Sequence, residues 1–294
     1  MTTRHPARRL GALLEPLTGQ VYFSPESHAG YEKLGFGPPT ITAIGLALPN
    51  GPAYFTSRGS VMGQVHGEVV AAAFGVFNPA AVVPAVQFGW SITDAPTICA
   101  TRDAGALGQL ERALGVPDNV ARAGEMLARM VDVLRPEGRS LFAGLLALPV
   151  PDDPWGSVWR NGDRLREYRG DSHIAVWASD GLDPVEIGLL TEPYWGLPLK
   201  SYIRTRAWED EQLDAGIDRL RSRDLLDGDG LTAEGRALRE SIEERTDHAM
   251  RAALAVVGDD FAELDALLAP WGAGVRAVKG YPPSGPHDVG GRPL

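Results

Sequence analysis

The sequence predicts a mostly α-helical protein made of two helical lobes. Apolar residues recur at helical spacing along most of the 294 residues, between helix start and stop signals. Alternation typical of strands is confined to one short segment, residues 225–231. A proline-rich joint at residues 149–154 divides the chain. We therefore expect an N-terminal lobe over 1–150, a C-terminal lobe over 151–279 and a disordered tail over 280–294.

The composition is that of an ordinary globular protein, with 44% hydrophobic and 22% charged residues. Cys99 is the only cysteine, which excludes an intrachain disulfide and fits a cytoplasmic location. The uncharged run 69–90 contains prolines together with Asn78 and Gln87, which would break a helix that spans a membrane. The formal net charge of −10 repels nucleic acid at long range, so DNA binding would require a local basic surface.

In the N-terminal lobe, start and stop signals delimit successive helices. Residues 7–17 carry leucines at helical spacing, and the Ser-Pro-Glu sequence at 24–26 supplies an N-cap, a first helical position and an acidic first turn. The Gly- and Pro-rich connection 37–52 has an apolar middle, which fits either a loop or a buried turn of helix. A helix is expected over about 62–77, and the Asn-Pro sequence at 78–79 starts the next one. Further helical patterns cover residues 95–114, 121–134 and 141–148.

The C-terminal lobe opens with the segment 159–184. It begins as an amphipathic helix, with Arg166 and Glu167 on its polar side, and it turns fully apolar around His173. A titratable ring that enters an apolar run is either a satisfied core histidine or a site residue.

The segment 206–257 contains a helix, an apolar pair, an Asp-Gly-Asp-Gly turn, a Thr N-cap and a long helix, in that order. The run RLRSRDLLDGDGLTAEGRALRE at 219–240 resembles the recognition helix, wing and following helix of MarR-like winged-helix proteins. Most of the chain resembles an actinobacterial helix-turn-helix family of the SalK type, through YF-x-x-R from Tyr54, F-N-P at 77–79, R-G-D-x-H at 169–173 and L-T-x-x-G-R-x-L-R from Leu231. The resemblance implies that the C-terminal lobe is a degenerate winged helix with a short β-wing, and that the protein takes part in gene regulation.

The surface that would read DNA in such a protein is acidic in this sequence. The N-terminal part of the second helix of a helix-turn-helix contacts the bases. Carboxylates occupy that part and the tip of the wing, at Glu209, Asp210, Glu211, Asp214, Asp227 and Asp229. They would repel phosphates, although acids also favour a helix N-terminus through the helix dipole. We therefore expect DNA to be a poor partner of this segment.

The two halves of the chain show a weak internal repeat. Sliding one half along the other aligns, without a gap, Tyr54 with Trp159, Glu68 with His173 and Pro79 with Pro184. The match is short, so coincidence and duplication both explain it. A true duplication would make the chain a pseudo-two-fold tandem repeat of two lobes with a shared cavity between them.

This repeat predicts a site at the pseudo-two-fold axis. Glu68 and His173 would face each other there and move a proton as an acid–base pair. The expected ligand-binding residues beside them are Tyr54, Arg58, Trp159, Arg169 and Trp177. An apolar cavity with a few convergent polar groups is the usual form of a small-molecule site.

Other interpretations of the same residues stay open. His173 can be a core histidine that donates to a backbone carbonyl, and Glu68 can pair with Arg58 as a buried link. His173 can also ligate a haem iron, although a single histidine is no motif, and no other cofactor is expected. Metal-ligand spacings such as HxxxH or CxxC are absent from the sequence, so no metal site is expected.

The sequence favours a protein that binds a small, largely apolar molecule between two lobes, with or without transforming it. The alternative is a MarR-like transcriptional regulator whose effector occupies the same cavity. A third interpretation is a structural or partner-binding protein.

Overall fold

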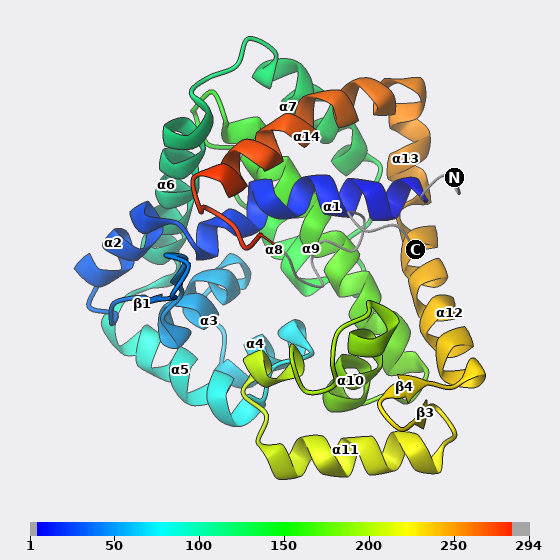
Figure 1. The fold of residues 1–294 in the computed structure, drawn as a ribbon. Coiled ribbons are helices and arrows are strands. Elements are labelled where there is room, and N and C mark those ends of the chain that lie inside the picture. Colours follow the sequence, from blue (N-terminus) through cyan, green and yellow to red (C-terminus); the bar gives the residue numbers. More distant parts are fainter. Residues whose placement is uncertain (1–4, 284–294) are drawn as a thin grey trace.

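The computed structural model describes residues 5–283, and the mostly α-helical fold class is confirmed (Figure 1). The α-helices follow one another along the chain as α1 (Pro6–Thr18), α2 (Pro25–Lys33), α3 (Gly51–Gly59), α4 (Gly67–Phe74), α5 (Pro79–Ile92), α6 (Ala95–Leu114), α7 (Val120–Asp132), α8 (Ser140–Ala147), α9 (Gly156–Ser179), α10 (Pro184–Tyr194), α11 (Asp210–Ser222), α12 (Ala233–Ala249), α13 (Arg251–Val257) and α14 (Phe261–Ala277). Two small antiparallel hairpins pair β1 (Thr40–Ile41) with β2 (Ala47–Leu48), and β3 (Leu226–Asp227) with β4 (Gly230–Leu231).

Helices start at the capping residues that the sequence indicates. The Ser24 hydroxyl accepts a hydrogen bond from the Ser27 N–H at 3.1 Å, at the start of α2. The Thr232 hydroxyl accepts one from the Gly235 N–H at 2.9 Å, at the start of α12. Each bond satisfies an N–H group that the helix itself leaves unpaired. The helix starts predicted at these two positions are confirmed.

Between α2 and α5 the chain is less helical than the sequence predicts. The connection 37–52 contains the β1–β2 hairpin, with Gly45 at a φ of 78° in its turn. The helix expected over 62–77 starts only at α4, because Gly63 with a φ of 83° turns the chain out of the preceding 3-10 helix. Glycine adopts this left-handed backbone at low cost.

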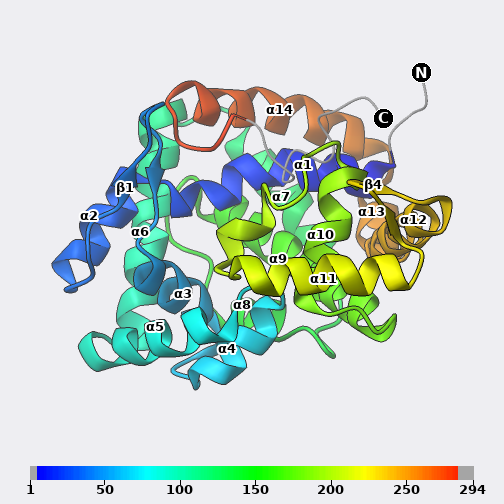
Figure 2. The same ribbon diagram turned by 60° about the horizontal axis from the view of Figure 1, so that its bottom comes forward.

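Helix α9 runs through the middle of the molecule and packs against α1, α7, α8 and α12 (Figure 1). Trp159 on α9 is fully buried in the largest hydrophobic cluster, which also contains Leu10 of α1, Met126 of α7 and Leu268 of α14. Helices α1 and α14, from the two ends of the chain, lie side by side (Figures 1 and 2). The cluster therefore joins residues from both predicted lobes, and the boundary at residue 150 stays a prediction.

The C-terminal region has the expected helix, hairpin and long helix, and it is preceded by α10, which was not predicted from the sequence. Helices α10 and α11 pack together, and the β3–β4 hairpin connects α11 to α12 (Figure 2). Leu213, Ile217 and Ile242 are buried in a hydrophobic cluster of this region. At Gly235 a Cβ atom would lie 2.0 Å from the Leu225 carbonyl oxygen, so glycine permits α12 to start against the hairpin.

The predicted tandem repeat has one local parallel in the structure. At the aligned positions Asn78 and Asp183, the side chains cap α5 and α10 by accepting from the N–H groups of Ala80 at 3.0 Å and Val185 at 2.8 Å. The preceding segments differ, because residues 51–74 are broken into α3 and α4 whereas α9 is continuous. Duplication of the two halves stays a prediction.

Within residues 5–283, no helix combines the length and the apolar character that crossing a membrane requires. The predicted disordered tail begins at residue 280, but Tyr281 is buried and its ring packs on Phe23 with centroids 5.6 Å apart. The remainder of that tail, 284–294, lies outside the described residues.

Candidate functional site

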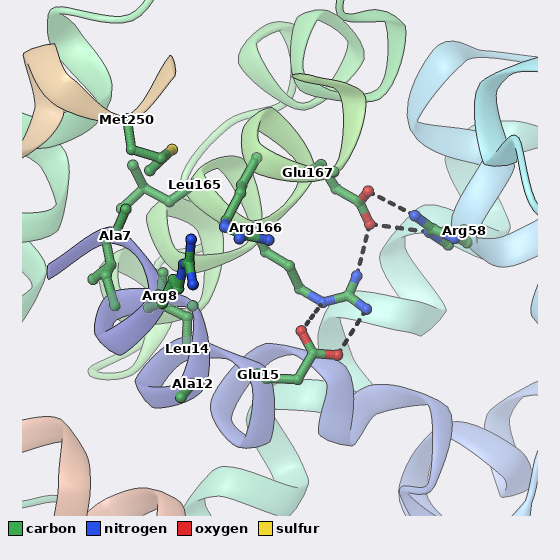
Figure 3. Close-up of a pocket in the computed structure, with 14 residues that line it drawn as sticks. Ala7, Arg8, Ala12, Leu14, Glu15, Arg58, Leu165, Arg166, Glu167 and Met250 are labelled. Carbon is green, nitrogen blue, oxygen red and sulfur yellow. Dashed lines mark hydrogen bonds and ion pairs between the residues drawn. The ribbon is translucent and has the colours of Figure 1, made fainter. Parts of the chain in front are cut away.

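A pocket of about 190 Å³ lies between α1 and α9, and Figure 3 shows the side chains around it. Helix α3 contributes Arg58, and the junction of α12 and α13 contributes Met250. Its apolar lining includes Ala7, Leu10, Leu14, Leu165 and Met250. Its charged lining consists of Arg8, Arg58, Arg166, Arg169, Glu15 and Glu167. The pocket therefore combines four guanidinium groups with an apolar wall.

At one end of the pocket, charged side chains form a continuous series of ion pairs (Figure 3). Arg58 donates to the Glu167 carboxylate from Nε at 3.0 Å and from Nη2 at 2.8 Å. Arg166 donates to the same carboxylate at 2.8 Å and to Glu15 at 2.8 and 3.0 Å. Burial alone would raise the pKa of Glu167, but Arg58 and Arg166 hold it below its ordinary value. In this series, two arginines and two glutamates balance one another.

At the other end, Arg8 and Arg169 connect the pocket to α12. Arg8 of α1 donates to Asp247 and to Glu240, each at 2.7 Å. Arg169 of α9 donates to Glu243 at 2.9 Å through Nη2. The Nε atom of Arg169 is buried and has no hydrogen-bond partner among residues 5–283. Arg169 therefore lines the pocket and has at least one N–H donor, Nε, that no described residue accepts from.

His173 lies on α9 beside these ion pairs and links α9 to α12. Its Nδ1 lies 3.1 Å from the Thr246 hydroxyl. That hydroxyl donates to the Ile242 carbonyl at 2.7 Å, so it accepts from the Nδ1–H of His173. Desolvation lowers the pKa of His173 to about 3, against the opposing effect of Glu243. At neutral pH this imidazole is uncharged.

The predicted pairing of Glu68 with His173 is not formed. Glu68 lies exposed in the first turn of α4, and no hydrogen bond or ion pair joins it to His173 within the described chain. The end of α4 faces α9, because a Cβ atom at Gly75 would lie 3.0 Å from Ile174 and 3.2 Å from Trp177. Glu68 lies about two helical turns before that contact. Its carboxylate occupies a position that the helix dipole favours.

Two of the five predicted ligand-binding residues, Arg58 and Arg169, line the pocket. Tyr54 lies next to Arg58, since its hydroxyl accepts from Arg58 Nη1 at 3.3 Å. Arg58 pairs with Glu167, and not with Glu68 as one interpretation of the sequence would have it.

The two predicted tryptophans lie in hydrophobic clusters and not at the pocket. Trp159 is fully buried, and its Nε1 donates to Asp103 at 2.8 Å. Trp177 is buried in the cluster of the C-terminal region, against Gly75. The structure therefore places the two arginines at the pocket with Tyr54 beside Arg58, and it places Glu68 and both tryptophans elsewhere.

Four charged residues of the pocket were not predicted as site residues: Arg8, Glu15, Arg166 and Glu167. The sequence places Arg166 and Glu167 on the polar side of an amphipathic helix, which normally faces solvent. In the structure α1 covers that side of α9. The adjacent opposite charges of Arg166 and Glu167 were the sequence signal for this contact, because they pair with Glu15 of α1 and Arg58 of α3.

The surface formed by α11 and the β3–β4 hairpin carries many carboxylates. Helix α11 and the hairpin tip expose Asp210, Glu211, Asp214, Asp218, Asp227 and Asp229. Two neighbouring arginines are engaged in ion pairs, with Arg204 at 2.8 Å from Asp210 and Arg219 at 2.5 Å from Asp183, whereas Arg221 donates to the Gly228 carbonyl at 3.0 Å. Figure 2 shows α11 along the outside of the molecule, where these carboxylates would meet an approaching phosphate backbone.

Within residues 5–283, no three or more His, Cys, Asp or Glu side chains are grouped so that they could hold a metal ion. Haem ligation through His173 stays a prediction, and it would have to use Nε2 because Nδ1 bonds to Thr246.

Comparison with known proteins places the chain in a family. A model described as a helix-turn-helix family matches residues 7–282, which covers both the pocket helices and the α10–α12 region. No curated protein matches the chain, and no solved structure matches it. The protein therefore belongs to this helix-turn-helix family.

Proposed function

We propose that the protein binds a small molecule with an anionic group and an apolar body in the pocket between α1 and α9. The composition of the pocket carries this proposal, since four arginines and two glutamates line it together with apolar side chains. Guanidinium groups recognise carboxylates and phosphates, and small-molecule sites are usually apolar with a few polar groups. The volume of about 190 Å³ lies below the range of about 300–1,000 Å³ typical of drug-sized ligands, so the proposed ligand is small.

Arg169 is well placed to contact this ligand. Its ion pairs use Nη2 alone, although a guanidinium has five N–H donors. Its Nε faces α1, since a Cβ atom at Gly11 would lie 3.9 Å from it, and it has no partner among the described residues. A buried donor without a partner costs about 1–3 kcal/mol, which an acceptor on a ligand would offset.

Native mass spectrometry of gently purified protein tests the proposal. We expect a small-molecule adduct on the wild type and its loss in Arg169→Met. Arg122→Met is the matched control, because Arg122 is an exposed arginine paired with Glu263 at 2.8 Å, and this variant should keep the adduct. A wild type free of any adduct, or an adduct retained by Arg169→Met, would count against the proposal.

An acid–base reaction by Glu68 and His173 is not part of this proposal. The two side chains are apart, and His173 is uncharged at neutral pH. A visible absorption band in the purified protein would instead support haem at His173. The proposed location is the cytoplasm, which a single cysteine, Cys99, favours.

A second candidate function is a DNA-binding regulator whose effector occupies the same pocket. Membership of a helix-turn-helix family favours it. The order of α10, α11, the β3–β4 hairpin and α12 supports the finer assignment to a MarR-like winged helix of the SalK type. The exposed carboxylates of α11 oppose it.

A gel-shift experiment with DNA from upstream of the gene separates the two candidates. A protein that only binds a small molecule should give no specific shift at near-physiological salt. The regulator predicts a salt-dependent, sequence-specific shift that the copurified molecule changes.

A further inference from the structure

Arg206 lies at the end of the 3-10 helix η3 (Ile203–Arg206), shortly before α11. Its guanidinium stacks over the rings of Phe77 at 4.6 Å and Tyr202 at 4.4 Å. Its backbone carbonyl accepts a hydrogen bond from the Asn78 N–H at 2.9 Å. This bond fixes the backbone that carries the side chain, so the guanidinium is held in place before any ligand binds.

Arg206 has no carboxylate partner among residues 5–283. Its Nη2 contacts the Tyr202 hydroxyl, and its Nε is buried without a hydrogen-bond partner within the described chain. Buried Arg102, in contrast, pairs with Asp163 at 2.9 Å. The buried Nε is a charge-bearing donor that no described residue accepts from, so it favours an anionic acceptor.

The charged neighbours of Arg206 do not supply that anion. Desolvation lowers the pKa of Arg206 to about 10, and the like charges of Arg58 and Arg166 also lower it. Those two arginines line the pocket and are already balanced by Glu167 and Glu15. Arg206 remains protonated at neutral pH, so it adds one positive charge that the carboxylates of the pocket leave unbalanced.

Aromatic rings lie between Arg206 and Arg58. Phe77, on which Arg206 stacks, lies 5.6 Å from Tyr54, and Arg58 lies over Phe74 at 4.4 Å. Arg206 is also partly exposed, so a solute can reach it. Two guanidinium groups on either side of aromatic rings suit an anion with an apolar or aromatic body.

We infer that Arg206 binds the anionic group of the ligand, and that this group is a single carboxylate on an apolar or aromatic body. The inference rests on the proposed function, because Arg206 does not itself line the pocket and would bind a ligand that reaches beyond Arg58 and Arg166, whose charges act on it. One negative charge balances one unpaired arginine, and the two oxygens of a carboxylate match the planar guanidinium. A neutral ligand would leave the charge of Arg206 unbalanced, and a dianion would exceed it.

Isothermal titration calorimetry with benzoate and octanoate, each compared with its neutral amide, tests this inference. We expect the wild type to bind at least one carboxylate tenfold or more tightly than its amide. Arg206→Met should remove this preference while still binding the amide weakly, and Arg206→Lys should keep part of it because the charge is retained. Arg204→Met is the matched control, since Arg204 is exposed and pairs with Asp210 at 2.8 Å, and it should behave as the wild type.

The possible outcomes of this experiment test the inference separately from the proposed function. Equal affinity of the wild type for acids and amides overturns the inference and leaves the proposed function standing. Unchanged preference in Arg206→Met also overturns it. Failure of both series to bind contradicts the inference, whereas the proposed function is decided by the adduct in native mass spectrometry. If Arg206→Met does not fold, Arg206→Lys decides, because complete loss of its preference for acids would contradict a role that depends on charge.

Discussion

The guanidinium of Arg169 on α9 donates to the carboxylate of Glu243 on α12 at 2.9 Å. Glu243 also binds Arg239 at 2.7 Å, and both of these side chains are almost fully buried. The same Arg169 lines the pocket. A ligand that accepts from Nε of Arg169 would bind a side chain that also holds α12 through Nη2, so we expect occupation of the pocket to affect the helix after the hairpin.

Glu243→Gln should destabilise the protein strongly. The substitution leaves Arg239 buried without its partner and weakens the tie to Arg169. Breaking a buried ion pair by removing one partner costs about 3–5 kcal/mol. Urea unfolding measures this free energy. Glu263→Gln is the control, since its pair with Arg122 is exposed and we expect little change in the free energy of unfolding. Equal effects of the two substitutions would contradict the prediction.

Glu68→Gln and Glu167→Gln form a second matched pair. Glu68 is exposed, so its substitution should change the free energy of unfolding by no more than about 0.5 kcal/mol and leave ligand binding intact. Glu167 is buried between Arg58 and Arg166, so its substitution should cost about 3 kcal/mol or more. Urea unfolding and native mass spectrometry check both variants. Loss of the adduct in Glu68→Gln would restore the acid–base hypothesis.

His173 should make stability fall as the solution is acidified. Its pKa is lowered to about 3 in the folded protein, while an unfolded histidine titrates near about 6.5. Between these values the unfolded chain binds more protons, so stability is lost as pH falls, by up to about 1.4 kcal/mol per pH unit. His173→Asn should lose less stability between about pH 7 and pH 5 in urea unfolding. If the free energy of unfolding falls equally with pH in the two proteins, His173 does not contribute to the pH dependence of stability.

Asp171 should have the opposite pH dependence. Its carboxylate accepts from the Phe142 N–H at 3.1 Å, and burial raises its pKa to about 7, above the value of about 3.9 in an unfolded chain. The folded protein binds more protons in this range, so stability is present at low pH and is lost as pH rises. Asp171→Asn, which retains an acceptor, should gain melting temperature relative to the wild type between about pH 5 and pH 8. A difference in melting temperature between the two proteins that stays constant over this pH range would refute the raised pKa of Asp171.

Much of the fold follows from local signals in the sequence. Ser24 and Thr232 cap the helices that they precede, as their side chains and the following residues indicate. The helix expected over 62–77 was too long, because helical periodicity does not reveal that Gly63 adopts a positive φ. The strands of the β1–β2 hairpin have two residues each, which is too short for an alternating pattern.

The candidate site was only partly predictable, because it depends on tertiary contacts. Arg58 and Arg169 were expected at the site and do line the pocket. Arg166 and Glu167 lie on a helix face that looks solvent-facing until α1 covers it. The alignment of the two halves predicted Glu68 at the site. Such an alignment carries no information about the break between α3 and α4.

A crystal structure of the natively purified protein tests the central claim most directly. We predict electron density for a small molecule between α1 and α9, with an acceptor atom within hydrogen-bond distance of Arg169 or Arg58. A pocket that contains only water, with each arginine bonded to its carboxylates alone, would contradict the claim.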